Sequence, residues 1–474
     1  MNITPRNFLF RRRSNSNVYR MFLWVILILG GIWLIRLVQA GDVKPLFEPT
    51  PVPTRMAVSF ALEGDAKFTA GQLEDSDTST GAITAYREAV ALDPNDAQLW
   101  AKLARIQTYS SAMIVNRDEV VARLAEAVES ARKAVELAPD DSNVHAVLAF
   151  TLDWSATYLT ADDARSMLAK AEQEAVRALQ LDPDNVLARS FYSEILLDQG
   201  KWKDAQQNIE QALQRDSSQM DAHRVHAAVL ESGQDYAAAI EAYERAIAIT
   251  PNLTFLYQRA GANYRRLASD SPNKDVQSQL YEKSLDKFDQ AARINAQLKV
   301  KDPGPYLSIA KTYSQMGQFF VAIRNVQKTI EFQPANPVFY GELGVLYHKN
   351  RNYETGILAL ECAVRGCTAE QSCPARGDCG RNDVATEVKG LPLRADTIYY
   401  YDIYASELAA LSTPKKSYCD QALAIADEIE ASEFDNDPNI AADIVVVRSL
   451  CDFTADASSA TVEPGAAVTP TARP

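Results

Sequence analysis

The chain has 474 residues, about twice what a single hydrophobic core usually serves, so several domains or a repeat array are expected. It carries 48 Lys and Arg residues against 62 Asp and Glu residues, a formal net charge of −14. This balance disfavours a nucleic-acid-binding protein, because phosphate binding needs a basic surface. The four His and six Cys residues limit metal and nucleophile chemistry.

The N-terminal segment has the pattern of a membrane-spanning helix. Residues 1–20 are basic, and residues 21–38 are apolar except for Arg36. Eighteen helical residues rise about 27 Å, close to the thickness of a hydrocarbon core. The positive-inside rule predicts a single-pass cell-membrane protein with a cytoplasmic N-terminus and an extracytoplasmic body. Val38-Gln39-Ala40 also fits a signal-peptidase site, so a cleaved signal sequence remains the alternative.

Two further segments are predicted to lack regular structure. Residues 39–56 contain four prolines and are predicted to form an extended linker. Residues 454–474 are small, polar and proline-containing, which is typical of a disordered tail.

Between these segments the sequence repeats itself. An apolar helix end followed by a turn recurs, with a proline at five of the turns: Pro94, Pro139, Pro183, Pro251 and Pro334. Ser217, Ala296 and Thr368 occupy the same slot in other copies. Six residues after the turn a large residue tends to recur: Trp100, His145, Arg189, His223, Tyr257, Tyr306 and Tyr340. Four residues later a small one follows: Ala104, Ala149, Ser193, Ala227, Gly261, Ala310 and Gly344.

This pattern resembles the tetratricopeptide repeat (TPR), a 34-residue helix–turn–helix. Residues 189–222, 306–334 and 340–363 carry the resemblance best, the last through Tyr340, Leu343, Gly344, Tyr347, Tyr353, Gly356, Leu360 and Ala363. It implies an all-α protein: a right-handed α-solenoid of about eight helix hairpins over 57–366, with a degenerate ninth hairpin and a capping helix over 397–453. The chain is similar in plan to membrane-anchored bacterial envelope TPR scaffolds.

Three copies are longer than the repeat by 10 or 11 residues. Eleven residues make about three helical turns, so the second helix of the copy lengthens while its apolar face stays in phase. Asn116, Thr160 and Ser271 are predicted to cap these long helices. The helices either project as ridges or pack on one another as additional core.

All six cysteines lie in the last quarter: Cys362, Cys367, Cys373, Cys379, Cys419 and Cys451. In an extracytoplasmic body an even number is expected to form disulfides, and Cys419 with Cys451 is the pair most favoured by neighbouring helices. The other four are expected to clip a Cys-rich loop over 367–396. Their spacing contains no C-x2-C pair, so we expect no metal, and we expect no cofactor.

The resemblance implies that the first helix of each hairpin lines a concave groove that binds a protein or peptide. Family positions 2, 5, 9 and 12 give this partner-binding groove: Arg105, Asn143, Phe150, Asp153, Glu194, Asp221, Arg224, Glu231, Phe255, Gln258, Arg265, Lys311 and His348. We therefore expect a scaffold that binds protein and no nucleic acid, and not an enzyme. The alternative is an enzyme or regulatory subunit acting on envelope glycans or peptides, with the Cys-rich loop near its site.

Overall fold

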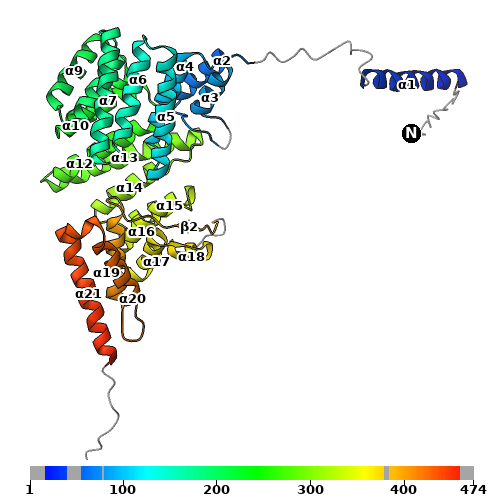
Figure 1. The fold of residues 1–474 in the computed structure, drawn as a ribbon. Coiled ribbons are helices and arrows are strands. Elements are labelled where there is room, and N and C mark those ends of the chain that lie inside the picture. Colours follow the sequence, from blue (N-terminus) through cyan, green and yellow to red (C-terminus); the bar gives the residue numbers. More distant parts are fainter. Residues whose placement is uncertain (1–16, 40–54, 77–78, 378–383, 460–474) are drawn as a thin grey trace, which may run out of the picture. The chain divides into compact units, whose positions relative to one another are not determined.

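The computed structural model describes residues 17–39, 55–76, 79–377 and 384–459, which divide into two compact units at Arg55 (Figure 1). The first unit contains one helix, α1 (Val18–Gln39), whose side chains are exposed and whose length and hydropathy suit a membrane span. Most of the predicted basic N-terminus, linker and tail lies outside the described residues.

The second unit is a stack of helix hairpins, and the described residues form nine of them. They are α2 (Ala57–Thr69) with α3 (Ala82–Leu92), α4 (Ala97–Ser111) with α5 (Arg117–Leu137), α6 (Ser142–Ala156) with α7 (Ala161–Leu181), α8 (Val186–Asp198) with α9 (Trp202–Arg215), α10 (Met220–Ser232) with α11 (Tyr236–Ile249), α12 (Thr254–Asp270) with α13 (Lys274–Leu298), α14 (Gly304–Gln315) with α15 (Phe319–Phe332), α16 (Pro337–Lys349) with α17 (Tyr353–Val364), and α19 (Ile398–Leu411) with α20 (Cys419–Glu430). The predicted α-solenoid of eight hairpins and a ninth is confirmed.

In the following, the first helix of each hairpin is called inner and the second outer. Successive inner helices such as α4, α6, α8 and α10 pack directly on one another. Small residues allow successive inner helices to approach closely. They also allow the two helices of one hairpin to pack together. A Cβ atom at Gly261 would lie 2.7 Å from the Phe288 ring, and one at Gly344 would lie 2.4 Å from Leu360 Cγ. A larger residue at either position would separate the two helices of its hairpin.

The recurring residues around each turn have a common physical role. A turn proline cannot continue the outer helix, so carbonyl groups near the helix end need other donors. An Asp or Asn two residues after the proline caps the next inner helix at Asp96, Asp141, Asn185 and Asn336. The large residue six positions after the turn hydrogen-bonds back to the turn carbonyl: Trp100 to Pro94 (2.9 Å), His145 to Pro139 (2.9 Å), Arg189 to Pro183 (2.9 Å), His223 to Ser217 (2.9 Å), Tyr257 to Pro251 (2.7 Å) and Tyr340 to Pro334 (3.0 Å).

The three long outer helices are α5, α7 and α13, with 21, 21 and 25 residues. Asn116 and Thr160 cap the first two as predicted. The cap of α13 is Asn273 and not the predicted Ser271, because the Asn273 side chain reaches two backbone amides of the first turn. The predicted turn at Ala296 was also wrong, because α13 continues to Leu298.

The N-terminal ends of two long helices carry exposed apolar side chains, which favours ridges over additional core. Val121 on α5 and Val276 on α13 remain 41% and 42% exposed. The start of α5 also meets a distant segment, since Arg394 donates to Asp118 at 3.1 Å and Val115 packs against the core around α15 and α16.

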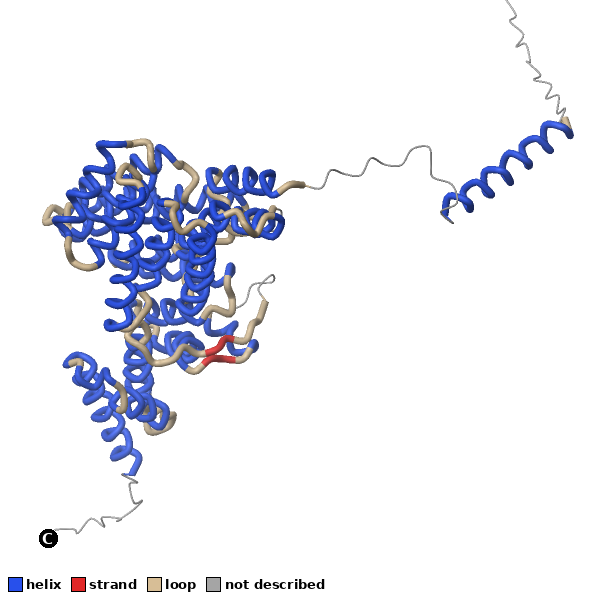
Figure 2. Tube along the Cα trace, turned by 45° about the horizontal axis from the view of Figure 1, so that its top comes forward, coloured by secondary structure: helices blue, strands red, loops and turns tan. Residues whose placement is uncertain are grey.

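The Cys-rich segment follows α17 and adds a short strand pair, β1 (Gly366–Cys367) with β2 (Val388–Lys389), and helix α18 (Ala369–Ala375) (Figure 2). After the ninth hairpin and a 3-10 turn (Glu433–Asn436), α21 (Pro438–Ser459) packs on α19 and α20. This helix takes the place of the predicted cap but continues past 453, so residues 454–459 are helical and not part of a tail.

Two disulfides are formed among the described residues. Cys419 at the start of α20 is bonded to Cys451 in α21, the pair that the sequence favoured. Cys362 is bonded to Cys367, which fixes the end of α17 to β1. Cys373 is also disulfide-bonded, and Cys379 lies outside the described residues.

Candidate functional site

All thirteen predicted groove residues lie on inner helices, but most polar members already have a partner in a neighbouring hairpin. The pairs are Asn143 with Asn185, Glu194 with Arg224, Glu231 with Arg259, Gln258 with Asp302, Arg265 with the Ser308 carbonyl, Lys311 with Glu342, and His348 with Glu407. We call this set the inter-hairpin ladder. In the observed arrangement it connects successive hairpins.

The most buried rung of the ladder is the pair of Arg224 and Glu194. Two parallel hydrogen bonds of 2.6 Å join them, and the residues are 5% and 8% exposed. The guanidinium carbon also lies 5.5–5.6 Å from the ring centroids of Tyr109, Phe150 and Trp154. A bidentate pair among aromatic rings is a strong, geometrically specific contact. The structure therefore places Phe150, Glu194 and Arg224 inside the protein, where a partner does not reach them.

A second contact closes the inner surface between hairpins that are distant in sequence. Arg105 and Tyr109 on α4 both donate to Asp221 on α10, which is 1% exposed. The Tyr109 ring also stacks on Phe255 of α12 at a centroid distance of 5.3 Å. The inner helices of the second, fifth and sixth hairpins thus meet across the axis. The groove predicted there is filled by the chain's own side chains.

Asp153 is the exception among the predicted polar residues. It is 1% exposed, and neither carboxyl oxygen has a hydrogen-bond partner in the described part of the chain. Burial, followed by the charges of Asp198 and Glu194, raises the pKa of Asp153 well above its ordinary value, although Arg224 opposes the shift. The shift favours the protonated form of Asp153, and the carboxylate that pairs with Arg224 is Glu194.

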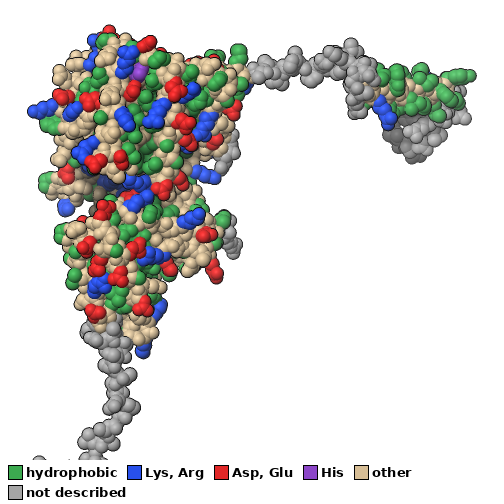
Figure 3. Space-filling view, viewed as in Figure 1, with side chains coloured by type: hydrophobic (Ala, Val, Ile, Leu, Met, Phe, Trp, Pro, Cys, Tyr) green, Lys and Arg blue, Asp and Glu red, His purple; other side chains and the backbone are tan. Residues whose placement is uncertain are grey.

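The remaining groove residues keep some solvent contact. Asn143 and Lys311 are exposed, whereas Gln258, Arg265 and His348 are partly buried. Figure 3 shows Lys and Arg side chains in the hollow between the helices labelled α12 and α14 in Figure 1. Of the predicted groove, this C-terminal part of the inner surface is accessible.

At the end of that surface, His348 lies beside a group of carboxyls on α19 and α21. His348 Nδ1 is 3.2 Å from Glu407 Oε1. Burial, then the neighbouring Asp443, raises the pKa of Asp402 to about 7. The folded protein therefore holds a proton on Asp402 that the unfolded chain loses above its ordinary pKa.

This proton makes stability depend on pH, and Asp402→Asn should reduce the dependence. The folded-state pKa of Asp402 is raised, so its contribution to the free energy of unfolding falls as pH rises from about 4 to about 7 and then levels off. We expect Asp402→Asn to match the wild type at pH 4 and to be more stable by about 4 kcal/mol at pH 7.5, the free-energy equivalent of a shift of about three pKa units. Thermal melting across this range measures the difference. Glu282→Gln, an exposed position on α13, is the control and should follow the wild type; a constant difference for Asp402→Asn would contradict the assignment.

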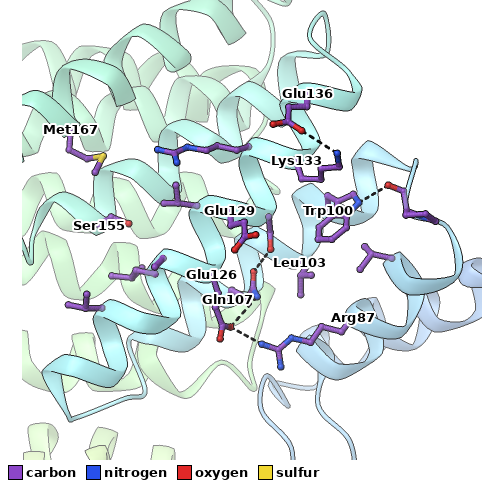
Figure 4. A pocket seen from close by; sticks show the side chains of 18 of the residues that line it. Arg87, Trp100, Leu103, Gln107, Glu126, Glu129, Lys133, Glu136, Ser155 and Met167 are labelled. Atoms are coloured by element: carbon purple, nitrogen blue, oxygen red, sulfur yellow. Dashed lines mark hydrogen bonds and ion pairs between the residues drawn. The ribbon is translucent and has the colours of Figure 1, made fainter.

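A different surface feature, which the sequence did not indicate, lies on the outer side of the stack. Helices α4 and α6 pack together, whereas the outer helices α3, α5 and α7 have little direct contact in the described chain. This divergence leaves a cleft of about 1150 Å³ along α5 (Figure 4). We call it the α5 cleft. It is lined by residues of all these helices: Arg87, Val90, Ala91, Pro94, Trp100, Leu103, Gln107, Val121, Leu124, Ala125, Glu126, Val128, Glu129, Ser130, Arg132, Lys133, Glu136, Ser155, Tyr158, Leu159 and Met167.

The polar groups of the α5 cleft lie around an apolar floor. Arg87 pairs with Glu126 at 2.7 Å, and Ser130 donates to Gln107 at 2.9 Å (Figure 4). Such a surface suits binding more than catalysis. Across the described residues, no group of three or more His, Cys, Asp or Glu side chains is arranged to hold a metal ion.

Comparison with known proteins gives one family match and several matches of fold. A tetratricopeptide repeat family model matches residues 193–253. No curated protein matches the chain. The human IFIT1 dimer with PPP-AAAA is 14% identical with a TM-score of 0.51, over 85% of this chain and 92% of that one. TTC0263, a thermophilic TPR protein in Thermus thermophilus, is 16% identical with a TM-score of 0.35, over 44% of this chain and 98% of that one.

The matched residues 193–253 run from α8 to the turn before α12, in the middle of the stack. The same hairpin, with its turn proline or a substitute and its small inner residue, recurs on both sides of this region. Residues 193–253 therefore belong to the tetratricopeptide repeat family, and hairpins of the same plan extend the array on both sides.

Proposed function

We propose that the protein is a membrane-anchored scaffold whose repeat array lies outside the cytoplasm and binds another protein. The observation that carries the proposal is the stack of nine hairpins in the described residues, together with the apolar helix α1. Stacked repeats create long surfaces suited to protein partners, and TPR arrays typically act as interaction scaffolds.

The disulfides support the extracytoplasmic location. Cys362–Cys367 and Cys419–Cys451 are oxidised. Such bonds persist in oxidising compartments and are rare in the cytoplasm. Together with the basic residues before α1, they favour an array on the outer side of the membrane.

The accessible C-terminal part of the inner surface is the region we propose for partner contact. Lys311 on α14 is 47% exposed and pairs with Glu342 at 3.2 Å, which leaves much of the ammonium group open to solvent. A partner carboxylate that approaches Lys311 replaces water without breaking a buried contact.

Charge reversal at Lys311 tests this proposal. We expect full-length Lys311→Glu, crosslinked in native membranes and then affinity-purified, to capture its partner protein at least 5-fold less than the wild type, with unchanged melting. The matched control is Arg215→Glu on outer helix α9, because Arg215 is 48% exposed and also pairs with one carboxylate, Asp184. Equal capture by both variants would remove Lys311 from the contact surface.

A nucleic-acid partner is tested in the same preparation. The net charge of −14 disfavours phosphate binding. Human IFIT1 has been solved with PPP-AAAA, so that oligonucleotide is the appropriate probe. We expect it not to bind; binding that weakens with Lys311→Glu would favour a nucleic-acid function instead.

A further inference from the structure

We propose that the α5 cleft is the docking site for an amphipathic α-helix of the partner, lying antiparallel to α5. The inference rests on the proposed scaffold function and names the kind of partner segment that the scaffold holds. It concerns the outer side of the first three hairpins, away from Lys311.

The cleft has the shape and lining that an apolar helix face requires. Its floor is formed by Leu103, Leu124 and Val128, which are 2%, 2% and 8% exposed. Its edges carry Val121 and Leu159, which are 41% and 39% exposed. A helix laid between the diverging outer helices would cover these edges and continue the outer layer.

The charged side chains along α5 indicate which charges a partner helix should carry. Glu126 and Glu129 are followed by Arg132 and Lys133, and all four line the cleft. The set spans eight residues, about 10 Å or two helical turns. Glu129 and Arg132 are exposed and form no ion pair with any described residue. A partner helix that offers a basic group to Glu129 and an acidic group to Arg132 therefore gives each of these two charges an ion-pair partner.

The direction of the partner helix follows from the same order of charges. An acidic residue of the partner suits the position opposite Arg132, and a basic residue suits the position opposite Glu129, because Glu126 and Lys133 already pair with Arg87 and Glu136. A helix is most stable with acidic residues near its N-terminus and basic residues near its C-terminus. Both conditions hold together when the partner's N-terminus lies beside the C-terminal part of α5. The partner helix is therefore antiparallel to α5.

Two synthetic peptides test the proposal directly. The forward peptide is an 18-residue helix with a leucine stripe, three Glu in its first two turns and three Lys in its last two turns. The reverse peptide has the Glu and Lys positions exchanged. Binding to the full-length protein in lipid nanodiscs is followed by fluorescence anisotropy, with empty nanodiscs subtracted. We expect the forward peptide to bind at least 5-fold more tightly than the reverse one.

Protein variants locate the binding and test its direction. Val121→Asp should weaken forward-peptide binding at least 10-fold, whereas Val276→Asp, equally exposed at the start of α13 outside the cleft, should change it less than 2-fold. The double variant Glu129→Lys with Arg132→Glu should prefer the reverse peptide. Equal affinity of the wild type for both peptides, or equal effects of Val121→Asp and Val276→Asp, would overturn the proposal.

Peptide binding at the α5 cleft and partner capture through Lys311 can fail independently of each other. Lys311→Glu should leave peptide binding unchanged, because Lys311 does not line the cleft. If the peptides fail to discriminate while Lys311→Glu still reduces partner capture, the cleft assignment is wrong and the scaffold proposal stands.

Discussion

Replacing Arg224 by Met is expected to lower the free energy of unfolding by about 3–5 kcal/mol. The change leaves Glu194 buried near Asp153, without the cation that compensates its charge. It also removes the guanidinium from the rings of Tyr109, Phe150 and Trp154. Urea denaturation followed by circular dichroism measures the effect.

The control for this substitution is an ion pair of similar length on the surface. Arg177 on α7 lies 2.9 Å from Asp140, and the two side chains are 43% and 86% exposed. Arg177→Met should therefore cost less than about 1 kcal/mol. If Arg224→Met were equally mild, the central pair would not be the buried contact that the structure describes.

Removal of the Cys419–Cys451 disulfide by a double Ser substitution should lower the free energy of unfolding by about 3–4 kcal/mol. The bond closes a segment with a sequence separation of 32, so its loss enlarges the unfolded ensemble considerably. It also frees α21, which covers the ninth hairpin. Denaturation with and without dithiothreitol measures the loss; the reductant should destabilise the wild type more than the double variant.

The second disulfide provides the comparison. Cys362 and Cys367 are separated by only five residues, so the same entropic reasoning gives about 2 kcal/mol for the corresponding double Ser variant. A larger loss at Cys362–Cys367 than at Cys419–Cys451 would show that α21 contributes little to the stability of the array.

The local pattern of the sequence was sufficient to predict the hairpins. The turn proline, the large residue six positions later and the small residue after it act within one repeat, as the bond from Trp100 to the Pro94 carbonyl illustrates. Long outer helices also followed from the sequence, because an 11-residue insertion preserves the apolar face. The cap of α13 was misplaced because Ser271 and Asn273 are both good capping residues.

The contacts of the inner-helix residues could not be predicted from the local repeat pattern. Arg105 and Asp221 meet only because the stack curves until α4 faces α10, and that curvature is a sum over many small packing angles. A usable signal was nevertheless present: Glu194 and Arg224, like Lys311 and Glu342, are opposite charges about one repeat apart. Such spacing indicates contacts between hairpins.

The α5 cleft gave no signal in the sequence. Its floor residues Leu103, Leu124 and Val128 occupy ordinary core positions. The cleft opens because the outer helices α3 and α5 diverge. Their divergence depends on how closely the inner helices approach one another.

The contact between Arg394 and Asp118, supported by Val115, joins the start of the ninth hairpin to the second. An array held only by neighbour-to-neighbour contacts can fray from either end, one repeat at a time. Here the loss of a terminal hairpin also removes support from a repeat near the opposite end. The array is thus linked beyond nearest neighbours, and loosening of the second hairpin is transmitted to the ninth.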